Sequence, residues 1–308
     1  MLIAGPFADI VKVIEDQVDK KYAISELASG RLAESCLSPN AGLGDIYAWL
    51  AQSQKGEEVA LQEMHICVFV SSYQTTADPK VGLDFIDAAS SGRAAVNRLC
   101  VDHGIGLRIL EMAPMLPHDV GDNWTELDCA KAVAFGMEAA AAGGHLLGIS
   151  DMAPGNLAGK LAMIANLIPN GEAWMQGLAS SESDPEIEHA LRLLEKHASK
   201  AIHPLDTLRI FGGREVAACL GAFFAAKSRN LPVIIDGWAA IAAIMVLESI
   251  AKDASDHVRI GACGDTLQQK VLMKLEKQSI IGSFIDAGPG CGSAVSLSVL
   301  KAAVDVVS

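Results

Sequence analysis

Short apolar segments alternate along this chain with longer segments of helical periodicity, and this alternation restricts the fold more than any other feature. The apolar segments span residues 65–71, 106–113, 145–151, 232–237 and 257–263. Between them, apolar residues recur every three or four positions, as on one face of an α-helix. Strands that are apolar on nearly every residue and joined by helices are typical of parallel sheets buried on both faces. The sequence therefore predicts an α/β fold with a doubly wound, mostly parallel sheet and helices on both faces.

Two regions show helical patterns without intervening strands. Residues 38–54 contain a glycine-rich turn that enters a helix, and residues 183–199 form an amphipathic pattern behind an acidic cap. We expect residues 1–60 to form a smaller helical subdomain with the tract 165–205 packed near it. Residues 61–308 are expected to form the α/β domain.

Charge and apolar content exclude several classes of partner. The formal net charge is −13 and no cluster of Lys or Arg occurs, which argues against nucleic acid, because phosphate neutralisation needs a basic face. Hydrophobic residues make up 51% of the chain, yet no apolar run reaches the length of a membrane span. The N-terminus lacks the basic and apolar regions of a signal peptide. We expect a cytoplasmic protein without a membrane partner.

Cysteine and histidine positions give no sign of a metal site or a disulfide framework. The seven cysteines have no C-x-x-C spacing, and their odd number within hydrophobic segments is typical of buried thiols in a reducing compartment. No histidines show metal-ligand spacing. The sequence thus predicts neither metal nor cofactor, and small molecules or other proteins as partners.

The stretch "DAGPGCG" (286–292) ends a strand-like segment and begins an apolar helix. Consecutive backbone N–H groups at a helix N-terminus favour an anion, so Gly288, Gly290, Gly292 and Ser293 are candidate substrate-binding residues. Pro289 removes one of the N–H donors. The alternative is a tight turn without a ligand.

Three long segments resemble, in the same order, one enzyme family. They are "DCAKAVAFGMEAAAAGGHLLGISDMAPGN", "FGGREVAACLGAFFAAKSRNLPVIIDGWAAIAA" and the closing "GPGCGSAVSLSVLKAA". Together with the early "PNAGLGDIYAWLAQSQ", they make the chain similar to nicotinate-nucleotide:dimethylbenzimidazole phosphoribosyltransferases over nearly its whole length. The resemblance implies transfer of phosphoribose from nicotinate mononucleotide to dimethylbenzimidazole, a step in making the lower ligand of cobalamin. It also implies a homodimer whose substrates are a nucleotide and an aromatic base.

The family's general base is a Glu in the motif "G-E-G-[ST]-G-A-A". This chain reads "GPGCGSA" (288–294), so the resemblance puts Pro289 at the position of that Glu. A proline side chain has no proton acceptor. We expect another group to serve as the base, or the reaction to be lost.

Asp151 is the first candidate to replace that base. The family motif "G-E-M-G-I-G-N-T-T" is matched by "SDMAPGNLA" (150–158), which makes the carboxylate shorter and retains Gly155 and Asn156 as candidate substrate contacts. Asp151 ends a predicted strand, where burial can raise the pKa of a carboxylate. The alternatives are a helix-capping or turn role for Asp151, and a compensating role for Asp286.

The remaining candidate substrate contacts follow two other strands. Ser72 and Tyr73 match the family's "H-G", and the ring of Tyr73 with the amide of Gln74 suits a flat heterocycle. A solvent-exposed loop is the alternative. Asp236 matches a family residue of the same type, with either a structural or a pocket role, and Gly237 permits close approach of a ligand to the backbone.

Two functions remain open from the sequence. The first is a phosphoribosyltransferase, a glycosyltransferase of the resembled family with impaired or altered activity. The second is a catalytically silent homologue that binds a nucleotide, an azole or a protein partner without turnover.

Overall fold

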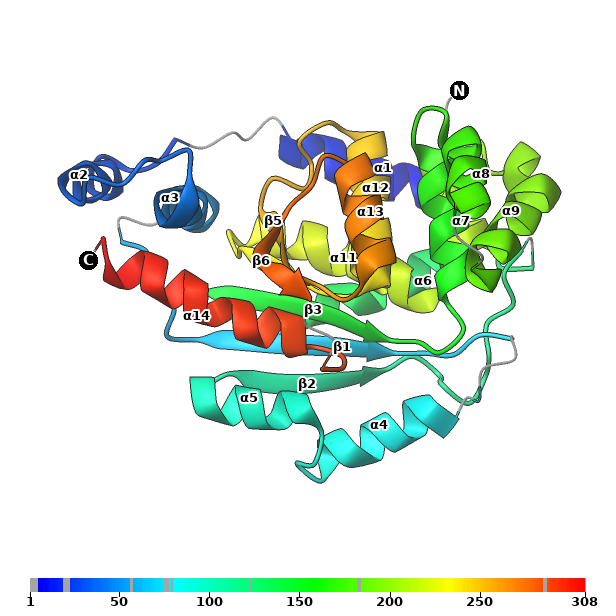
Figure 1. Cartoon of the computed structure of the whole chain (residues 1–308), viewed down its shortest axis with the longest axis horizontal. Coiled ribbons are helices and arrows are strands. Elements are labelled where there is room, and N and C mark those ends of the chain that lie inside the picture. The colour runs from blue at the N-terminus through cyan, green and yellow to red at the C-terminus, as the bar shows by residue number, and fades with distance from the viewer. Residues whose placement is uncertain are drawn as a thin grey trace.

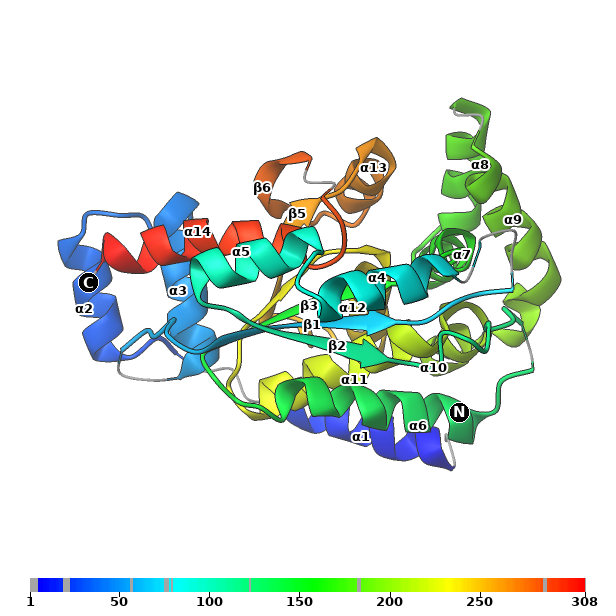
Figure 2. The ribbon, with the colours of Figure 1, turned by 90° about the horizontal axis from the view of Figure 1, so that it is seen from below.

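A single six-stranded parallel sheet forms the centre of the molecule (Figures 1 and 2). The computed structural model describes residues 5–18, 23–55, 58–74, 78, 80–121, 123–181, 184–284 and 287–307. The strand order is β2-β1-β3-β4-β5-β6. The strands are β1 (Met64–Val70), β2 (Gly106–Glu111), β3 (Leu146–Met152), β4 (Val233–Ile235), β5 (Val258–Cys263) and β6 (Ser279–Phe284).

Helices fill the connections between the strands and precede the first one. In chain order they are α1 (Pro6–Val18), α2 (Glu26–Glu34), α3 (Gly42–Gln54), α4 (Lys80–Ser90), α5 (Ala95–His103), α6 (Glu126–Met137), α7 (Leu157–Leu167), α8 (Gly171–Ser181), α9 (Pro185–His197), α10 (Pro204–Thr207), α11 (Arg214–Ser228), α12 (Trp238–Ile250), α13 (Thr266–Lys274) and α14 (Cys291–Asp305).

Alternate residues of the strands supply two hydrophobic cores, one on each face of the sheet. In β1, Cys67 and Phe69 belong to the core that includes α1, α6, α11 and α12. Ile66 and Val68 belong to the core that includes α3, α5 and α14. Figure 2 shows α4, α5 and α14 on one side of the sheet and α1, α6 and α11 on the other. The predicted doubly wound α/β fold with helices on both faces is therefore confirmed.

The strand order reverses direction at β1. The chain places β2 on one side of β1 and then returns to place β3 on the other side, after which β4, β5 and β6 follow in order. In parallel α/β sheets, ligands bind outside the carboxyl ends of the strands near such a reversal. The carboxyl ends of β1 and β3 therefore mark the region in which to look for a site.

Two helices of the predicted N-terminal subdomain, α2 and α3, lie apart from the helices of the tract 165–205. Both views show α2 and α3 at one end of the molecule and α8 and α9 at the other (Figures 1 and 2). Helix α3 packs against α14, while α8 and α9 pack against α7. Helix α1, which also belongs to residues 1–60, contributes to the same hydrophobic core as α8 and α9, so the expectation that residues 165–205 pack near residues 1–60 stays a prediction. The division at residue 60 stays a prediction.

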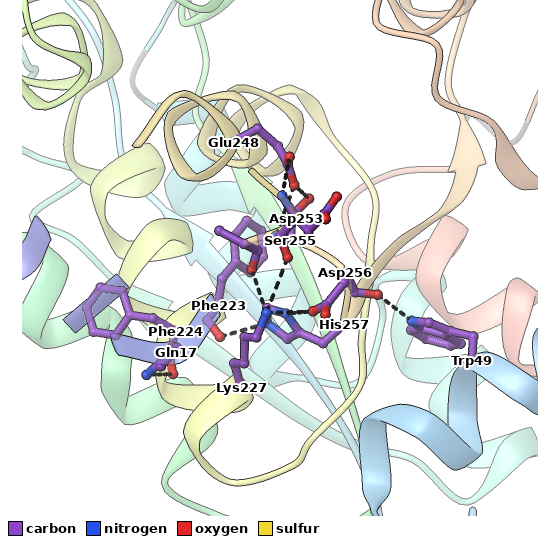
Figure 3. A network of polar contacts seen from close by, with 11 residues as sticks. Gln17, Trp49, Phe223, Phe224, Lys227, Glu248, Asp253, Ser255, Asp256 and His257 are labelled. Carbon is purple, nitrogen blue, oxygen red and sulfur yellow. Dashed lines mark hydrogen bonds and ion pairs between the residues drawn. The ribbon is translucent and has the colours of Figure 1, made fainter. Parts of the chain in front are cut away.

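The amino ends of the strands are fastened by a polar network, which Figure 3 shows from close by. Lys227, at the end of α11, pairs with Asp256 at 2.7 Å just before β5 begins. The indole N–H of Trp49 in α3 donates to the carbonyl of Asp256 at 3.0 Å. This network joins α3 and α11 to the sheet at the edge opposite the carboxyl ends. None of the helices described is both long and apolar enough to cross a membrane.

Candidate active site

A cavity of about 220 Å³ opens at the carboxyl edge of the sheet. The ends of β3, β4 and β5 and the turn before α14 line it, so it lies beside the reversal point rather than on it. Its polar and turn residues are Ser150, Asp151, Asp236, Gly237, Gly264, Asp265, Gln268, Gly288 and Pro289. Parallel strands bring these residues together although they are distant in sequence.

Asp151 lies in the wall of this cavity, near the end of β3. Its Oδ1 accepts a hydrogen bond from the backbone N–H of Ala239 at 3.1 Å, and its Oδ2 accepts one from Nδ2 of Asn156 at 2.9 Å. Burial raises the pKa of Asp151 to about 6, with Lys160 opposing and Glu215 adding to the rise. A carboxylate with a pKa near neutrality is suited to accept a proton at physiological pH.

A fully buried ion pair stands directly behind Asp151. Lys160 in α7 pairs with Glu215 in the first turn of α11, and neither side chain is accessible to solvent. Nδ2 of Asn156 lies 3.4 Å from Oε1 of Glu215 and also donates to Asp151, so its amide bridges the pair and the cavity wall. The Lys160 ammonium holds the pKa of Glu215 below its usual value although burial opposes this.

Hydroxyl groups from the end of β1 complete this network. The hydroxyls of Ser71 and Tyr73 donate to Glu215, the latter at 2.6 Å, and Lys160 donates to the Tyr73 oxygen at 3.0 Å. Burial, with Glu215 adding to it, raises the pKa of Tyr73 well above its ordinary value. Tyr73 therefore remains a protonated donor within the network.

The three residues expected after the first strand do not line the cavity. The Tyr73 ring is buried and packs edge-on against His118, and the Ser72 hydroxyl donates to the carbonyl of Pro114 at 2.6 Å. Gln74 is exposed, and its backbone N–H donates to the carbonyl of His118. Tyr73 is not in a solvent loop, and a base-binding role for these residues stays a prediction.

Backbone N–H groups at the glycine turn and the start of α14 donate to side chains of the chain itself. Oδ2 of Asp236 accepts the backbone N–H of Ser293 at 3.0 Å, and the Ser150 hydroxyl oxygen accepts the N–H of Gly290 at 2.9 Å. A Cβ at Gly292 would lie 2.9 Å from Oδ2 of Asp236, so a side chain there would displace this carboxylate. The expected anion position is therefore filled by Asp236.

The other glycines of the site allow close approach at turns. Gly237 has a φ of 92°, and a Cβ there would lie 2.5 Å from Oδ1 of Asp151. Gly155 and Gly288 also have positive φ, in the turn before α7 and in the cavity wall. Asp286 lies outside the described residues, so its alternative role as a base stays a prediction.

Lys160, Glu215 and Ser71 were missed as site residues from the sequence. Lys160 is the one charged residue within the apolar run "LAGKLAMIANL", and Glu215 precedes the apolar run "VAACLGAFFAA". A charged residue within a helix that is otherwise buried needs a buried partner of opposite sign. That signal could have found both residues, although it could not have paired them.

No group of three or more His, Cys, Asp or Glu residues within the described part of the chain could hold a metal ion. The carboxylates of the cavity instead contact backbone N–H groups and the amide of Asn156. The arrangement suits proton transfer and binding of an organic ligand.

Comparison with known proteins agrees with this fold. A family model described as phosphoribosyltransferase matches residues 23–308. The nicotinate-nucleotide–dimethylbenzimidazole phosphoribosyltransferase of Sinorhizobium fredii is 32% identical over 97% of this chain and 93% of its own length. The enzyme of the same name from Brucella anthropi is 32% identical over 97% of this chain and 93% of its own length.

Solved structures show the same architecture. The crystal structure of CobT from Thermus thermophilus superimposes with a TM-score of 0.70 at 18% identity, covering 97% of this chain and 96% of that one. The crystal structure of the nicotinate-nucleotide–dimethylbenzimidazole phosphoribosyltransferase from the same organism superimposes with a TM-score of 0.71, also at 18% identity. By the family match and the identity to its members, this chain belongs to the nicotinate-nucleotide–dimethylbenzimidazole phosphoribosyltransferase family.

Proposed function

We propose that the cavity at the carboxyl edge transfers a phosphoribosyl group from nicotinate mononucleotide to an aromatic azole such as dimethylbenzimidazole, with Asp151 as the general base. The names of the relatives supply the reaction: nicotinate nucleotide is the donor and dimethylbenzimidazole the acceptor. The same chemistry would place the chain in the synthesis of the cobalamin lower ligand.

The proposed step balances without a metal ion or redox partner. The lone pair of one azole nitrogen forms a bond to the anomeric carbon, and the bond from that carbon to the pyridinium nitrogen breaks. The electron pair of the broken bond stays on that nitrogen, so nicotinate leaves with a neutral ring. The proton on the other azole nitrogen moves to the carboxylate of Asp151.

The single observation that carries this proposal is the position of Asp151 in the cavity wall together with its raised pKa. It lies in the cavity wall, its two oxygens are held by Ala239 and Asn156, and its pKa is raised to about 6. A base of this pKa is ionised at neutral pH and still binds a proton well enough to assist the transfer. Pro289, at the same cavity, has no side-chain acceptor that could serve.

The test is a product assay with nicotinate mononucleotide and a panel of azoles, separating the azole riboside phosphate by chromatography. Asp151→Asn should lower kcat by about 10²–10⁴, the range for loss of a general base. Asp256→Asn, which alters the network at the opposite edge of the sheet, should retain the parent's rate. In the parent, the rate should rise with pH through about 6, because the base must be ionised. An Asp151→Asn variant as active as the parent would overturn the role of Asp151.

A second candidate function is binding without turnover. Pro289 lines the cavity at the position that the family resemblance assigns to its catalytic Glu. For this alternative, calorimetry would detect binding of the azole or the nicotinate glycoside while the product assay stays at the background rate. Turnover by the parent protein would exclude it.

We also propose a cytoplasmic homodimer. Met115 and Leu116, on the segment after β2, are 64% and 66% exposed, which is unusual for adjacent large apolar side chains and suits a subunit contact. Light scattering coupled to size-exclusion chromatography should give twice the mass of the chain. The replacement of Met115 and Leu116 by Lys should shift that mass towards a monomer.

A further inference from the structure

Carboxylates outnumber side-chain N–H donors in the wall of the cavity at the carboxyl edge. Asp151, Asp236 and Asp265 contribute three carboxylates, whereas the described residues that line the cavity include neither Lys nor Arg. Their side-chain N–H groups come from Trp238 and Gln268. The donor of the proposed reaction, nicotinate mononucleotide, carries a phosphate and a ring carboxylate. An anionic oxygen of this donor therefore depends on neutral hydrogen-bond donors of the wall.

The side-chain amide of Gln268, in the first turn of α13, has a fixed orientation. Its Oε1 accepts the backbone N–H of Gly264 at 2.6 Å. A backbone N–H group only donates, so the amide oxygen and not the amide nitrogen must face Gly264. The two N–H groups on Nε2 of Gln268 are therefore left for another partner.

These two N–H groups have no acceptor among the residues that the structure describes. Gln268 is only 3% exposed. A buried polar group without a partner is costly, and most buried polar side-chain atoms of folded proteins are paired. The amide of Gln268 is thus a donor in the cavity wall that an oxygen of a ligand would satisfy.

The surrounding backbone holds this amide in place before any ligand binds. Oδ1 of Asp265 accepts the backbone N–H of Gln268 at 2.7 Å and thereby caps α13. Gly264 directly follows the last residue of β5. The amide is therefore tied to the end of a strand and to the start of a helix. A side chain that is already ordered loses little conformational entropy when it binds, which favours its use in recognition.

We propose that Gln268 recognises the glycosyl donor by donating its side-chain N–H groups to an anionic oxygen of that molecule, on the phosphate or on the ring carboxylate. A hydrogen bond to a charged acceptor is stronger than one between neutral groups. The contact determines which donor is bound and leaves the bonds at the anomeric carbon unchanged. This proposal rests on the proposed function, because it takes the glycosyl donor to occupy this cavity.

Gln268→Glu tests the contact directly. The Glu carboxylate still accepts the N–H of Gly264 and has nearly the volume of Gln, but its second oxygen replaces the N–H donor by a like charge. Titration calorimetry on the full chain should show nicotinate mononucleotide binding at least about tenfold more weakly, a difference of about 1.4 kcal/mol. The KM of this donor should rise while the KM of the azole stays unchanged. An unchanged affinity for the mononucleotide would overturn the proposal.

Gln269→Glu is the matched control, because it adds the same charge to the next residue of α13, which is exposed and does not line the cavity. Its affinity for the mononucleotide should equal that of the parent, and a loss as large as that of Gln268→Glu would overturn the proposal. Gln268→Met removes the N–H donor without adding a charge. If its thermal unfolding midpoint is close to the parent's, it should bind the mononucleotide roughly threefold to tenfold more weakly.

Two analogues identify the oxygen that Gln268 contacts. Nicotinamide mononucleotide keeps the phosphate and lacks the ring carboxylate, whereas nicotinate riboside keeps the carboxylate and lacks the phosphate. If the phosphate accepts the hydrogen bond, Gln268→Glu weakens the binding of nicotinamide mononucleotide and not that of the riboside. If the carboxylate accepts it, the pattern is reversed. An equal loss for both analogues would indicate a general disturbance of the cavity and would overturn the proposal.

Failure of this inference and failure of the proposed function have different signatures. Binding of the mononucleotide that depends on Gln268, without any product, would leave the inference standing and remove the function. Transfer by the parent together with an unchanged affinity in Gln268→Glu would do the reverse. If the parent does not bind the mononucleotide, both proposals fall.

Discussion

Glu215 and Lys227 stand at the two ends of helix α11, and each belongs to a charged network at one edge of the sheet. Glu215 lies in the first turn beside Lys160, whereas Lys227 lies in the last turn beside Asp256. Both positions agree with the helix dipole, which favours an acid near the N-terminus and a base near the C-terminus. The same helix therefore allows a direct comparison of the carboxyl edge with the amino edge.

The partners of the two networks differ in kind. At the carboxyl edge, Glu215 is bound by the side chains of Ser71, Tyr73, Asn156 and Lys160. At the amino edge, Lys227 donates to the backbone carbonyls of a loop at Asp253 and Ala254 as well as to Asp256 (Figure 3). The first network joins side chains to a cavity, and the second fixes the path of a loop.

Solvent exposure differs in the same direction. Lys160 and Glu215 are inaccessible to solvent, while the side chain of Asp256 is 42% exposed. Water can screen the amino-edge pair but not the carboxyl-edge pair. We infer that the carboxyl edge keeps a costly buried pair because its charges reach Asp151, whereas the amino edge needs only hydrogen bonds that hold the chain in place.

The largest effect expected from this difference is that of Lys160→Met. It leaves the Glu215 carboxylate buried without its counter-charge, which costs about 3–5 kcal/mol of unfolding free energy. Urea unfolding at pH 7 measures the loss.

The double variant Lys160→Met with Glu215→Gln provides the matched control. Gln keeps the side-chain oxygen that accepts from Ser71 and Tyr73 and removes the unpaired charge. The double variant should therefore be more stable than Lys160→Met alone. If the two changes simply added, the charge pair would not be the source of the loss.

The second effect concerns how the unfolding free energy depends on pH, because the aspartates at the two edges should contribute with opposite sign. The pKa of Asp151 is raised to about 6, so the folded state binds its proton more tightly than the unfolded state. Its contribution to stability is present below about pH 4 and is lost as the pH rises through 6. The Asp151→Asn variant lacks this loss, so its unfolding free energy relative to that of the parent should increase by about 2–3 kcal/mol as the pH rises from 4 to 7.

The contribution of Asp256 to stability changes with pH in the opposite direction. Burial opposes the change, but hydrogen bonds from His257 and Lys227 lower the pKa of Asp256 to about 2. Its stabilising contribution is present above about pH 4 and is lost as the pH falls towards 2. Asp256→Asn should therefore weaken the protein near neutrality and not at pH 2, by about 1 kcal/mol given its exposure. Urea titrations across this pH range that gave equal slopes for the two variants would contradict the comparison.

The strands of the sheet could be predicted from the sequence, whereas the contacts of the site could not. The sheet was predictable because strands buried on both faces have to be apolar throughout, as in "HICVFV" of β1, and that pattern is local. Asp151 was predictable as a cavity residue for a related reason, since it ends a strand of a parallel sheet.

The contacts of the site were not predictable, because they depend on the pairing of distant segments. Asp236 and Ser293 are far apart in sequence, and only the packing of α14 beside β4 brings the carboxylate onto the glycine turn. The sequence could predict N–H groups suited to an anion at this turn, with a turn without a ligand as the alternative, but it could not show that Asp236 of the same chain accepts one of them. Likewise, Lys160 and Glu215 each indicate a buried partner without identifying it.

The smallest effect is expected for Lys227→Met, which is the counterpart of Lys160→Met at the other end of the comparison. Because Asp256 is partly exposed, its charge remains solvated when Lys227 is removed, and the loss should be at most about 1 kcal/mol. The pKa of Asp256 should rise at the same time, because Lys227 is one of the two groups that lower it. Urea unfolding at low and high salt measures the first effect, and carboxyl NMR titration measures the second. A loss as large as that of Lys160→Met would mean that the amino-edge pair is as poorly solvated as the carboxyl-edge pair, and the contrast between the two ends of α11 would disappear.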